Sequence, residues 1–396
     1  MSTKQNYIAE LDNLKNQRVI KLITGLSNNY KEEVLSKFKI RLNMEGVQNE
    51  RIHSIRFTSS LFTPEDILER IKSILVEGKM SYIFLYEIHN LPHFDILLLE
   101  LFKLRFIDIY AISSSNICHY GSLLKNLRGK YKEINILPLS YKAYCSHLEP
   151  NHKENLISYI TYGTTINPSL GTSLSLISEI ENHYNSVLFS EVQFMQERED
   201  LLTRNINNIP LLKSISRYLM LNIGKKVTVM GITEDLRKHN MNASTITVKD
   251  YIDALCDCFI FYPLSLYEAN THKVLETPKK YYVAPLSFME VVVNKTLIDT
   301  NALYESIIYF ELLRRGYKVY HCRYRSTPIT FMAEQDNMIS YIQVALEIKD
   351  DSTFSSLSKP FRKLKNSHNI ILTSSLNYID TYDNFSVIDL TSWLFI

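Results

Sequence analysis

The stretch that decides the fold is VIKLITGLSNNYKEEVLSKF, which runs from residue 19 to residue 38. Its first part, Val19–Ile23, is mostly apolar and predicts a buried strand. Its last part repeats apolar residues at helical spacing and predicts a helix that packs on a sheet. Between them, Gly25 and Lys31 keep the spacing of the first glycine and the lysine of a phosphate-binding loop (P-loop), in which backbone N–H groups surround the phosphates. The stretch therefore predicts a strand, a P-loop-like turn and a helix.

Two residues that such a loop needs are replaced. A second glycine lets the backbone approach the phosphates, and a Ser or Thr hydroxyl after the lysine binds Mg²⁺. Tyr30 stands at the glycine position and Glu32 at the hydroxyl position. The sequence therefore predicts the geometry of the loop together with a loss of its phosphate and metal chemistry.

The composition limits the other function classes. The chain has 396 residues, enough for two to four domains, and its 45% hydrophobic and 22% charged residues are ordinary for a globular protein. The net charge of +2 gives no global attraction to nucleic acid or to a membrane surface. Five cysteines without a C-x-x-C pair, an N-terminus without a signal-peptide core and charges throughout Tyr82–Ile112 predict a reduced, cytoplasmic protein without a membrane span.

The first 140 residues alternate strands and helices. The near-continuous apolar strands predict a parallel sheet covered by helices on both faces. One helix has clear boundaries, since Thr63 and Pro64 suit its N-cap and first position and Gly78 suits its end. The predicted strands are Val19–Ile23, Arg51–Phe57, Tyr82–Tyr86, Asp108–Ile112 and Lys132–Leu137.

Polar residues follow the third and fourth of these strands. In a P-loop NTPase, one strand ends in a carboxylate that holds Mg²⁺ and a second acidic residue that polarises water. Here Glu87 takes the second position, while Tyr86 takes the first. A phenol with a pKa near ~10 is a poor ligand for Mg²⁺ at neutral pH. Asn116, after the next strand, stands where a polar side chain senses the γ-phosphate.

The remaining residues predict three further units. Residues 141–209 are helical and less regular. Residues 210–290 contain three helices and a strand pair at the spacing of a winged helix. A strong helix at Leu303–Arg315, followed by five strands, predicts a second α/β domain over residues 296–396.

The ordered series of motifs resembles the prokaryotic AAA+ ATPases that carry a C-terminal domain of unknown function with a restriction-endonuclease-like fold. Three family motifs read TGxRRxGKS, FLDEIQ and TGSN, where this chain has TGLSNNYKE, FLYEIH and SSSN. The resemblance covers nearly the whole chain. It rests on residues 24–32, 84–89, 113–116, 129–131, 138–141, 222–224, 247–252, 280–282, 304–317 and 341–344.

This resemblance implies that the first 140 residues are a P-loop NTPase core. It implies that the next three units are a helical lid, a winged helix and a restriction-endonuclease-like domain. Gly25, Lys31 and Lys130 are the implied nucleotide-binding residues, with Lys130 standing in for the family's arginine. Glu87 is the implied vestigial catalytic residue and Asn116 the sensor-like one. ATP with Mg²⁺ is the implied ligand only if the altered loop still binds it.

The C-terminal domain lacks most of a nuclease site. A nuclease of this fold needs a helix acid, a strand Asp and an E-x-K on the next strand, which hold Mg²⁺ and activate water. Glu305 supplies the first, while Thr330 stands at the Asp position and Gln343–Ala345 at the E-x-K position. Because one carboxylate does not build a metal site, we expect Glu305 to be structural, no metal to be bound and no nuclease activity.

A basic, tyrosine-rich stretch has two interpretations. Arg314, Arg315, Arg323 and Arg325, interleaved with tyrosines, suit phosphate contacts and base stacking. Alternatively, the first two complement the dipole of a helix end and the others lie on an ordinary half-exposed strand, which is the interpretation we favour. The third helix of the winged-helix unit carries Lys249 against three aspartates, which favours packing over DNA contact.

Three functional hypotheses follow. The leading one is an ATPase-like protein with an eroded nucleotide site that acts as a binding or scaffold module for a protein partner. The alternative is an active ATPase in which Lys31 binds phosphate and Glu87 orients water. The second alternative is a DNA-binding regulator that uses the winged helix.

Overall fold

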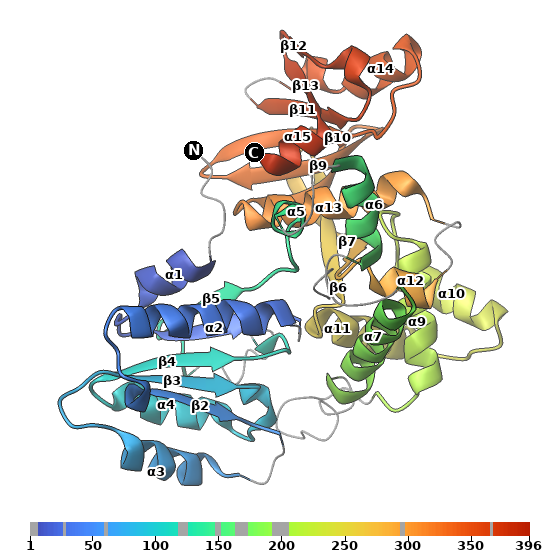
Figure 1. Cartoon of the computed structure of the whole chain (residues 1–396). Helices are drawn as coiled ribbons and strands as arrows, with labels where there is room; N and C mark the ends of the chain where they lie inside the picture. The colour runs from blue at the N-terminus through green and yellow to red at the C-terminus, as the bar shows by residue number, and fades with distance from the viewer. Residues whose placement is uncertain are drawn as a thin grey trace.

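The computed structural model is an α/β protein with two sheets (Figure 1). It describes residues 7–26, 29–58, 62–117, 126–146, 152–162, 173–191, 206–293, 298–364 and 367–396. The N-terminal sheet lies at the lower left of Figure 1 and the C-terminal sheet at the top, with the helices of the middle of the chain to the right.

The N-terminal sheet has five parallel strands in the order β2-β3-β4-β1-β5. Every residue of β1 and β3 is buried, as expected for strands that are covered on both faces. The predicted parallel sheet is therefore confirmed. Its strands are β1 (Ile20–Thr24), β2 (Ile52–Arg56), β3 (Ser81–Tyr86), β4 (Ile107–Ile112) and β5 (Tyr131–Asn135).

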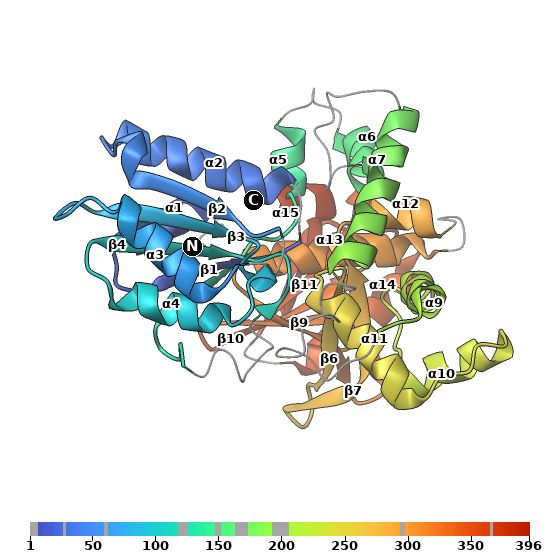
Figure 2. The same ribbon diagram turned by 90° about the horizontal axis from the view of Figure 1, so that it is seen from below.

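Two pairs of helices cover the two faces of this sheet (Figure 2). On one face, Leu35 and Phe38 of α2 pack against the stacked rings of Phe84 and Tyr110. On the other face, α3 and α4 pack against the opposite side chains of the same strands, and α3 begins with the predicted cap at Thr63. The bounds are α1 (Tyr7–Leu14), α2 (Asn29–Met44), α3 (Pro64–Ile74) and α4 (Phe94–Lys103).

The parallel strand order brings distant polar residues to one edge. The carboxyl ends of β1, β3 and β4 are neighbours, so the P-loop-like turn, Glu87 and the serine run after β4 meet there. Near the amino ends of the strands, Lys21 of β1 pairs with Asp108 of β4, and both side chains are buried. The sheet thus has a buried cation near each end of its central strand.

The helices of the middle of the chain share one apolar core with the C-terminal domain. This core contains Ile215 of α9, Leu255 of α11 and Ile308 of α13. The elements are α5 (Tyr141–Cys145), α6 (His152–Tyr162), α7 (Ser173–Ser186), the π-helical turn η5 (Val187–Glu191), α9 (Ile209–Leu221), α10 (Val229–Lys238), α11 (Thr245–Asp257), α12 (Phe288–Val292) and α13 (Thr300–Arg314).

The second sheet has eight strands in the order β12-β13-β11-β10-β9-β8-β6-β7. The hairpin of β6 and β7, which the sequence places in a winged-helix unit, joins this sheet because β6 pairs in parallel with β8. Residues distant in sequence, such as Leu266 and His321, form this pairing. The strands are β6 (Phe261–Glu268), β7 (Lys273–Val283), β8 (Lys318–Tyr324), β9 (Thr327–Gln335), β10 (Met338–Val344), β11 (His368–Thr373), β12 (Asp380–Tyr382) and β13 (Phe385–Asp389).

The C-terminal domain also contains elements that the sequence did not predict. These include the short edge strand β12 and the last helix, α15 (Leu390–Phe395). Between β10 and β11 lie α14 (Asp351–Ser358) and the 3₁₀ turn η7 (Phe361–Lys363). Among the described helices, none has the length and apolar character needed to cross a bilayer.

Candidate functional site

Lys31 lies in the first turn of α2, where the P-loop-like turn enters the helix. Its side chain points into the protein, and the residue is only 1% exposed. Its ammonium group donates hydrogen bonds to the carbonyl oxygens of Gly25 (3.0 Å) and Ser113 (3.2 Å) and to Ser114 Oγ (3.1 Å). Three oxygens from the loop and from the end of β4 therefore surround the cation that a P-loop would direct at phosphate.

Glu87 supplies the negative charge next to this cluster. It follows β3 in the left-handed conformation (φ 52°) and accepts hydrogen bonds from the N–H (3.1 Å) and Oγ (2.7 Å) of Ser114. Burial opposes its ionisation, but the charges of Lys31 and His89 and the Ser114 bonds outweigh burial and lower the pKa of the Glu87 carboxyl. Because Ser114 Oγ accepts from Lys31 and donates to Glu87, it links the two charges.

The positions that would bind Mg²⁺ have other partners. Glu32 pairs with Arg56 at the end of β2 (2.6 Å). Tyr86 is 4% exposed, and the cations of Lys39 and Arg56 lie 4.8 and 4.7 Å from its ring centre. Burial raises the pKa of the Tyr86 phenol, so it remains a neutral and poor ligand for a hard cation. Within the described ranges, no group of three His, Cys, Asp or Glu side chains could hold a metal ion.

Gly25 has a structural requirement of its own. Its φ is +128°, and a Cβ built there would lie 2.4 Å from the carbonyl oxygen of Ile136. No other residue fits this turn without moving the backbone that follows β5. The glycine of the predicted loop therefore serves the packing of the turn, whether or not a phosphate binds there.

Two predicted residues lie outside this cluster. Lys130 precedes β5, whose first residue pairs with Ile20, so it lies at the opposite edge of the sheet from Lys31. Its ammonium donates to the carbonyl of Asn126 (2.8 Å). The backbone N–H of Asn116 donates to the carbonyl of Asp257 (2.8 Å), which ties the loop after β4 to α11. The structure thus brings Gly25, Lys31 and Glu87 together, but it does not bring Lys130 to them.

Comparisons with known proteins concern the fold of the N-terminal domain. Residues 26–145 match the family described as AAA domain. A Walker-type ATPase of Pyrococcus abyssi has a similar fold, with a TM-score of 0.50 and 13% identity over 74% of this chain and 96% of the other. The N-terminal domain is an AAA-type, P-loop NTPase-like domain. At 13% identity the structural likeness shows the fold alone, so the chemistry of the AAA-like domain has to be argued from its own residues.

The other matches say less about function. Residues 190–292 match a domain of unknown function (DUF8612). An uncharacterised protein of Haemophilus influenzae is 24% identical over 407 residues, covering 100% of this chain and 98% of that protein. A DNA polymerase III gamma subunit-related protein of Thermotoga maritima covers 78% of this chain and 98% of its own, but its TM-score is only 0.29, so it carries no argument.

The three positions of the C-terminal domain that were compared with a nuclease site have protein partners. Glu305 of α13 accepts hydrogen bonds from Tyr282 OH (2.9 Å) and Lys280 Nζ (3.3 Å). Nearby, Thr330 Oγ1 accepts from the N–H of Val344 (3.0 Å), and Gln343 accepts from the N–H of Thr330 (3.2 Å). The Glu305 carboxylate is therefore balanced by a lysine and a tyrosine.

The four arginines predicted as weak nucleic-acid contacts differ in their surroundings. Arg314 and Arg315 both pair with Glu311, and Arg315 lies 3.9 Å from the ring centre of Trp393 and is buried. Arg323 pairs with Glu268, whereas Arg325 is exposed. The helix-end interpretation therefore fits the first two, whose phosphate contacts would require breaking buried ion pairs.

Several residues that shape the candidate site were missed from the sequence. Arg56 contacts both Glu32 and Tyr86, and the only signal was its place at the end of the strand next to β3. His89 lies 3.1 Å from Ser113 Oγ and 3.5 Å from Glu87, and no spacing rule marked it. These contacts depend on the order of the strands in the sheet, which the sequence predicts only in outline.

Proposed function

We propose that this chain is an ATPase-like protein that does not hydrolyse ATP and that works as a binding or scaffold module. The observation that carries the proposal is the state of Lys31. Its ammonium is 1% exposed and already has three protein oxygens around it, so phosphate binding would have to displace these contacts. A buried ammonium with satisfied hydrogen bonds gains little by exchanging them.

The metal position supports the same proposal. Mg²⁺ needs several oxygen ligands in near-octahedral geometry. At this position the chain has Glu32 in an ion pair with Arg56, and Tyr86 beneath two cations. Two positive side chains next to the metal position oppose the binding of a divalent cation.

The C-terminal domain fits a module without catalysis. We infer that it has the restriction-endonuclease-like fold predicted from the sequence, because Asn301 bonds both Glu305 of α13 and the carbonyl oxygen of Val344 in β10, and Thr330 of β9 bonds the N–H of the same Val344. The balance of Glu305 by Lys280 and Tyr282 favours a structural role over metal binding. A protein partner is then the natural target of the molecule, as for many chains that retain a fold without its chemistry.

The proposal is tested by measuring phosphate release from ATP with and without Mg²⁺. The samples are the full chain, Lys31→Ala and Glu87→Gln. We expect all three to release phosphate at the rate of the buffer alone. Mg²⁺-dependent turnover that is lost in both variants would overturn the proposal and establish an active ATPase with an altered loop.

A second experiment asks whether the replaced residues are the cause. The triple variant Tyr30→Gly, Glu32→Ser and Tyr86→Asp restores the glycine, the hydroxyl and the carboxylate. We expect this variant to bind Mg²⁺-ATP, because the restored hydroxyl and carboxylate would hold Mg²⁺, and the phosphates of the bound Mg²⁺-ATP would then replace the three oxygens around Lys31. If the folded triple variant gains no affinity, the eroded residues do not explain the loss, and the pocket itself is closed.

A further inference from the structure

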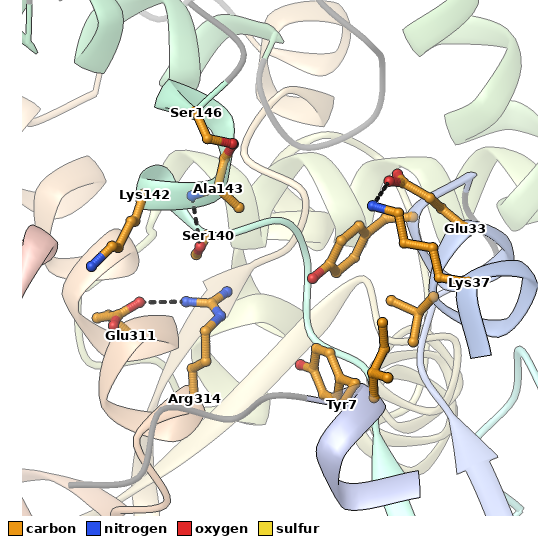
Figure 3. A pocket seen from close by; sticks show the side chains of 12 residues that line it. Tyr7, Glu33, Lys37, Ser140, Lys142, Ala143, Ser146, Glu311 and Arg314 are labelled. Carbon is orange, nitrogen blue, oxygen red and sulfur yellow. Dashed lines mark hydrogen bonds and ion pairs between the residues drawn. The ribbon is translucent and has the colours of Figure 1, made fainter. Parts of the chain in front are cut away.

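A cavity separates the AAA-like domain from the C-terminal domain. Its volume is about 370 Å³, which is within the range of small-molecule sites. Helices α1 and α2 form one side, and α5 and α13 form the other. Figure 3 shows Glu33 and Lys37 on one side of this cavity and Ser140, Lys142 and Arg314 on the other. None of its residues belongs to the Lys31 cluster.

Arg314 lines the cavity with a guanidinium group that uses only some of its N–H donors. It donates to Glu311 Oε2 (2.6 Å) and to the carbonyl oxygen of Pro138 (2.6 Å), and its side chain is 11% exposed. A guanidinium has five N–H donors in a planar fork that matches a carboxylate. Within the described part of the chain, its remaining N–H groups have no hydrogen-bond partner.

Two tyrosine hydroxyls add further donors. Tyr7 OH accepts a hydrogen bond from the N–H of Leu137 (2.8 Å), so its own hydrogen is available, and it points to the side on which Arg314 lies (Figure 3). Tyr30 OH has no hydrogen-bond partner among the described residues, although the residue is half-buried. Burial raises the pKa of Tyr30, so its hydroxyl stays protonated and can donate.

The charges around the cavity favour an anion. Lys37 is paired with Glu33 (2.5 Å), and Lys142 donates to the carbonyl oxygen of Phe395. Glu311 is shared between Arg314 and Arg315. Among the residues that line the cavity, three cations (Lys37, Lys142 and Arg314) face two carboxylates (Glu33 and Glu311), so the lining has an excess of one positive charge.

The other walls are apolar or aromatic. Ile8, Val34 and Ala143 line the cavity, and the rings of Tyr7 and Tyr30 lie 6.4 Å apart at 69°. Such walls suit a flat, apolar body whose charged group is held at one end.

We propose that this cavity binds a small aromatic carboxylate, whose carboxylate accepts hydrogen bonds from Arg314 and the two tyrosine hydroxyls. The ligand would bridge α2 of the AAA-like domain and α13 of the C-terminal domain. Binding of a small acid would then stabilise the contact between the two domains. The cavity lies beside Tyr30, the residue that precedes Lys31 in the P-loop-like turn. This proposal goes beyond the proposed function and does not rest on the absence of ATP hydrolysis.

The test uses three probes with one ring system, 2-naphthoate, 2-naphthyl phosphate and 2-naphthol, in calorimetric titrations of the full chain. We expect saturable binding of 2-naphthoate in the millimolar range or tighter, and binding of 2-naphthol that is at least about tenfold weaker, because the alcohol lacks the charge-assisted bonds. Absence of 2-naphthoate binding at millimolar concentration, or tighter binding of the phosphate ester, would overturn the assignment to a carboxylate.

Three variants locate the site. Tyr30→Phe removes only the hydroxyl without a partner, so we expect an unchanged thermal midpoint and binding that is about tenfold weaker. Ala143→Phe fills the cavity and should abolish binding, whereas Lys249→Ala, on α11, should leave it unchanged. Arg314→Lys keeps the charge but loses the fork, and we expect weaker binding. If 2-naphthoate binds Tyr30→Phe and Ala143→Phe as well as it binds the unaltered chain, the ligand lies elsewhere and the proposal fails.

Discussion

The Lys31 cluster and the Glu305 site compensate a partly or fully buried charge in opposite ways. At the first, neutral oxygens surround the buried ammonium of Lys31. At the second, a lysine and a tyrosine hydroxyl bind the carboxylate of Glu305 directly. At the first site, Ser114 Oγ connects the charges of Lys31 and Glu87 through hydrogen bonds. At the second site, Lys280 and Glu305 form a direct ion pair.

The depth of burial makes this difference matter. The two acids are similarly buried, with side chains that are 13% (Glu87) and 12% (Glu305) exposed, but Lys31 is 1% exposed whereas the Lys280 side chain is 15% exposed. Charges that are more deeply buried interact more strongly and cost more when their partners are removed. We therefore expect the AAA-like domain to depend on Lys31 for stability more than the C-terminal domain depends on the pair of Lys280 with Glu305.

The largest effect is expected from Lys31→Met. This change leaves Glu87, whose side chain is 13% exposed, next to an apolar side chain and should destabilise the protein by about 3–5 kcal/mol. Urea unfolding monitored for the AAA-like domain measures it. Lys37→Met, at an exposed i,i+4 pair on the same helix, is the matched control and should change stability by less than about 1 kcal/mol.

The double variant Lys31→Met with Glu87→Gln should recover most of that loss, because both charges are then absent. A single Lys31→Met that is as stable as the control would show that the cluster contributes nothing, and the comparison between the two sites would fail.

The next effect concerns the pH dependence near the second site. His321 lies on β8, and burial, with the charges of Lys280, Lys226 and Arg323, lowers its pKa to about 4. In the unfolded chain the pKa is near 6.5, so only the unfolded state binds this proton between those values. The contribution of His321 to stability is fully present above pH 6.5 and is lost as the pH falls toward 4, by about 3 kcal/mol in total.

His321→Gln keeps a donor for the carbonyl oxygen of Pro278 and removes the titration. We expect the difference in stability between the unaltered chain and this variant to shrink between pH 6.5 and 4. Urea midpoints measured across this range test the prediction, and a difference that does not vary with pH would refute the neutral, buried histidine.

A smaller effect is expected from Lys280→Met. Glu305 then keeps Tyr282 OH and its contact with Asn301, so the loss should be about 1–2 kcal/mol. Lys279→Met is the adjacent control, since its partner Glu276 is exposed and the pair should contribute less than about 1 kcal/mol. A loss at Lys280 as large as that at Lys31 would show that burial does not separate the two sites.

The sequence predicted the AAA-like domain more fully than the rest. Its strands are nearly continuous apolar runs, so strand bounds such as Tyr82–Tyr86 differ from the structure by only one residue. The meeting of Gly25, Lys31 and Glu87 followed from parallel strands alone. The ion pair of Lys21 with Asp108 did not, because a charged residue within an apolar strand gives no sign of its partner.

Elsewhere the structure depends on contacts between distant segments. The pairing of Leu266 with His321 joins the hairpin to the C-terminal sheet, and no local pattern indicates it. The cavity beside Arg314 is lined by α1 and α2 near the N-terminus, by α5, and by α13 of the C-terminal domain. The helix was predicted to end at Arg315, one residue after its end in the structure. The position of Tyr7 and Tyr30 across the cavity from Arg314 could not be predicted, since it follows from how the two domains pack.

The central claim is that Lys31 is held by the protein and is not available to a nucleotide. The most direct test is a calorimetric titration with ATP and with ADP, each with and without Mg²⁺. The samples are the full chain and its Lys31→Ala variant. We predict no Mg²⁺-dependent heat at millimolar nucleotide, and the same result for the variant. Micromolar binding that requires Mg²⁺ and disappears in Lys31→Ala would contradict the claim and show that the altered loop still binds phosphate.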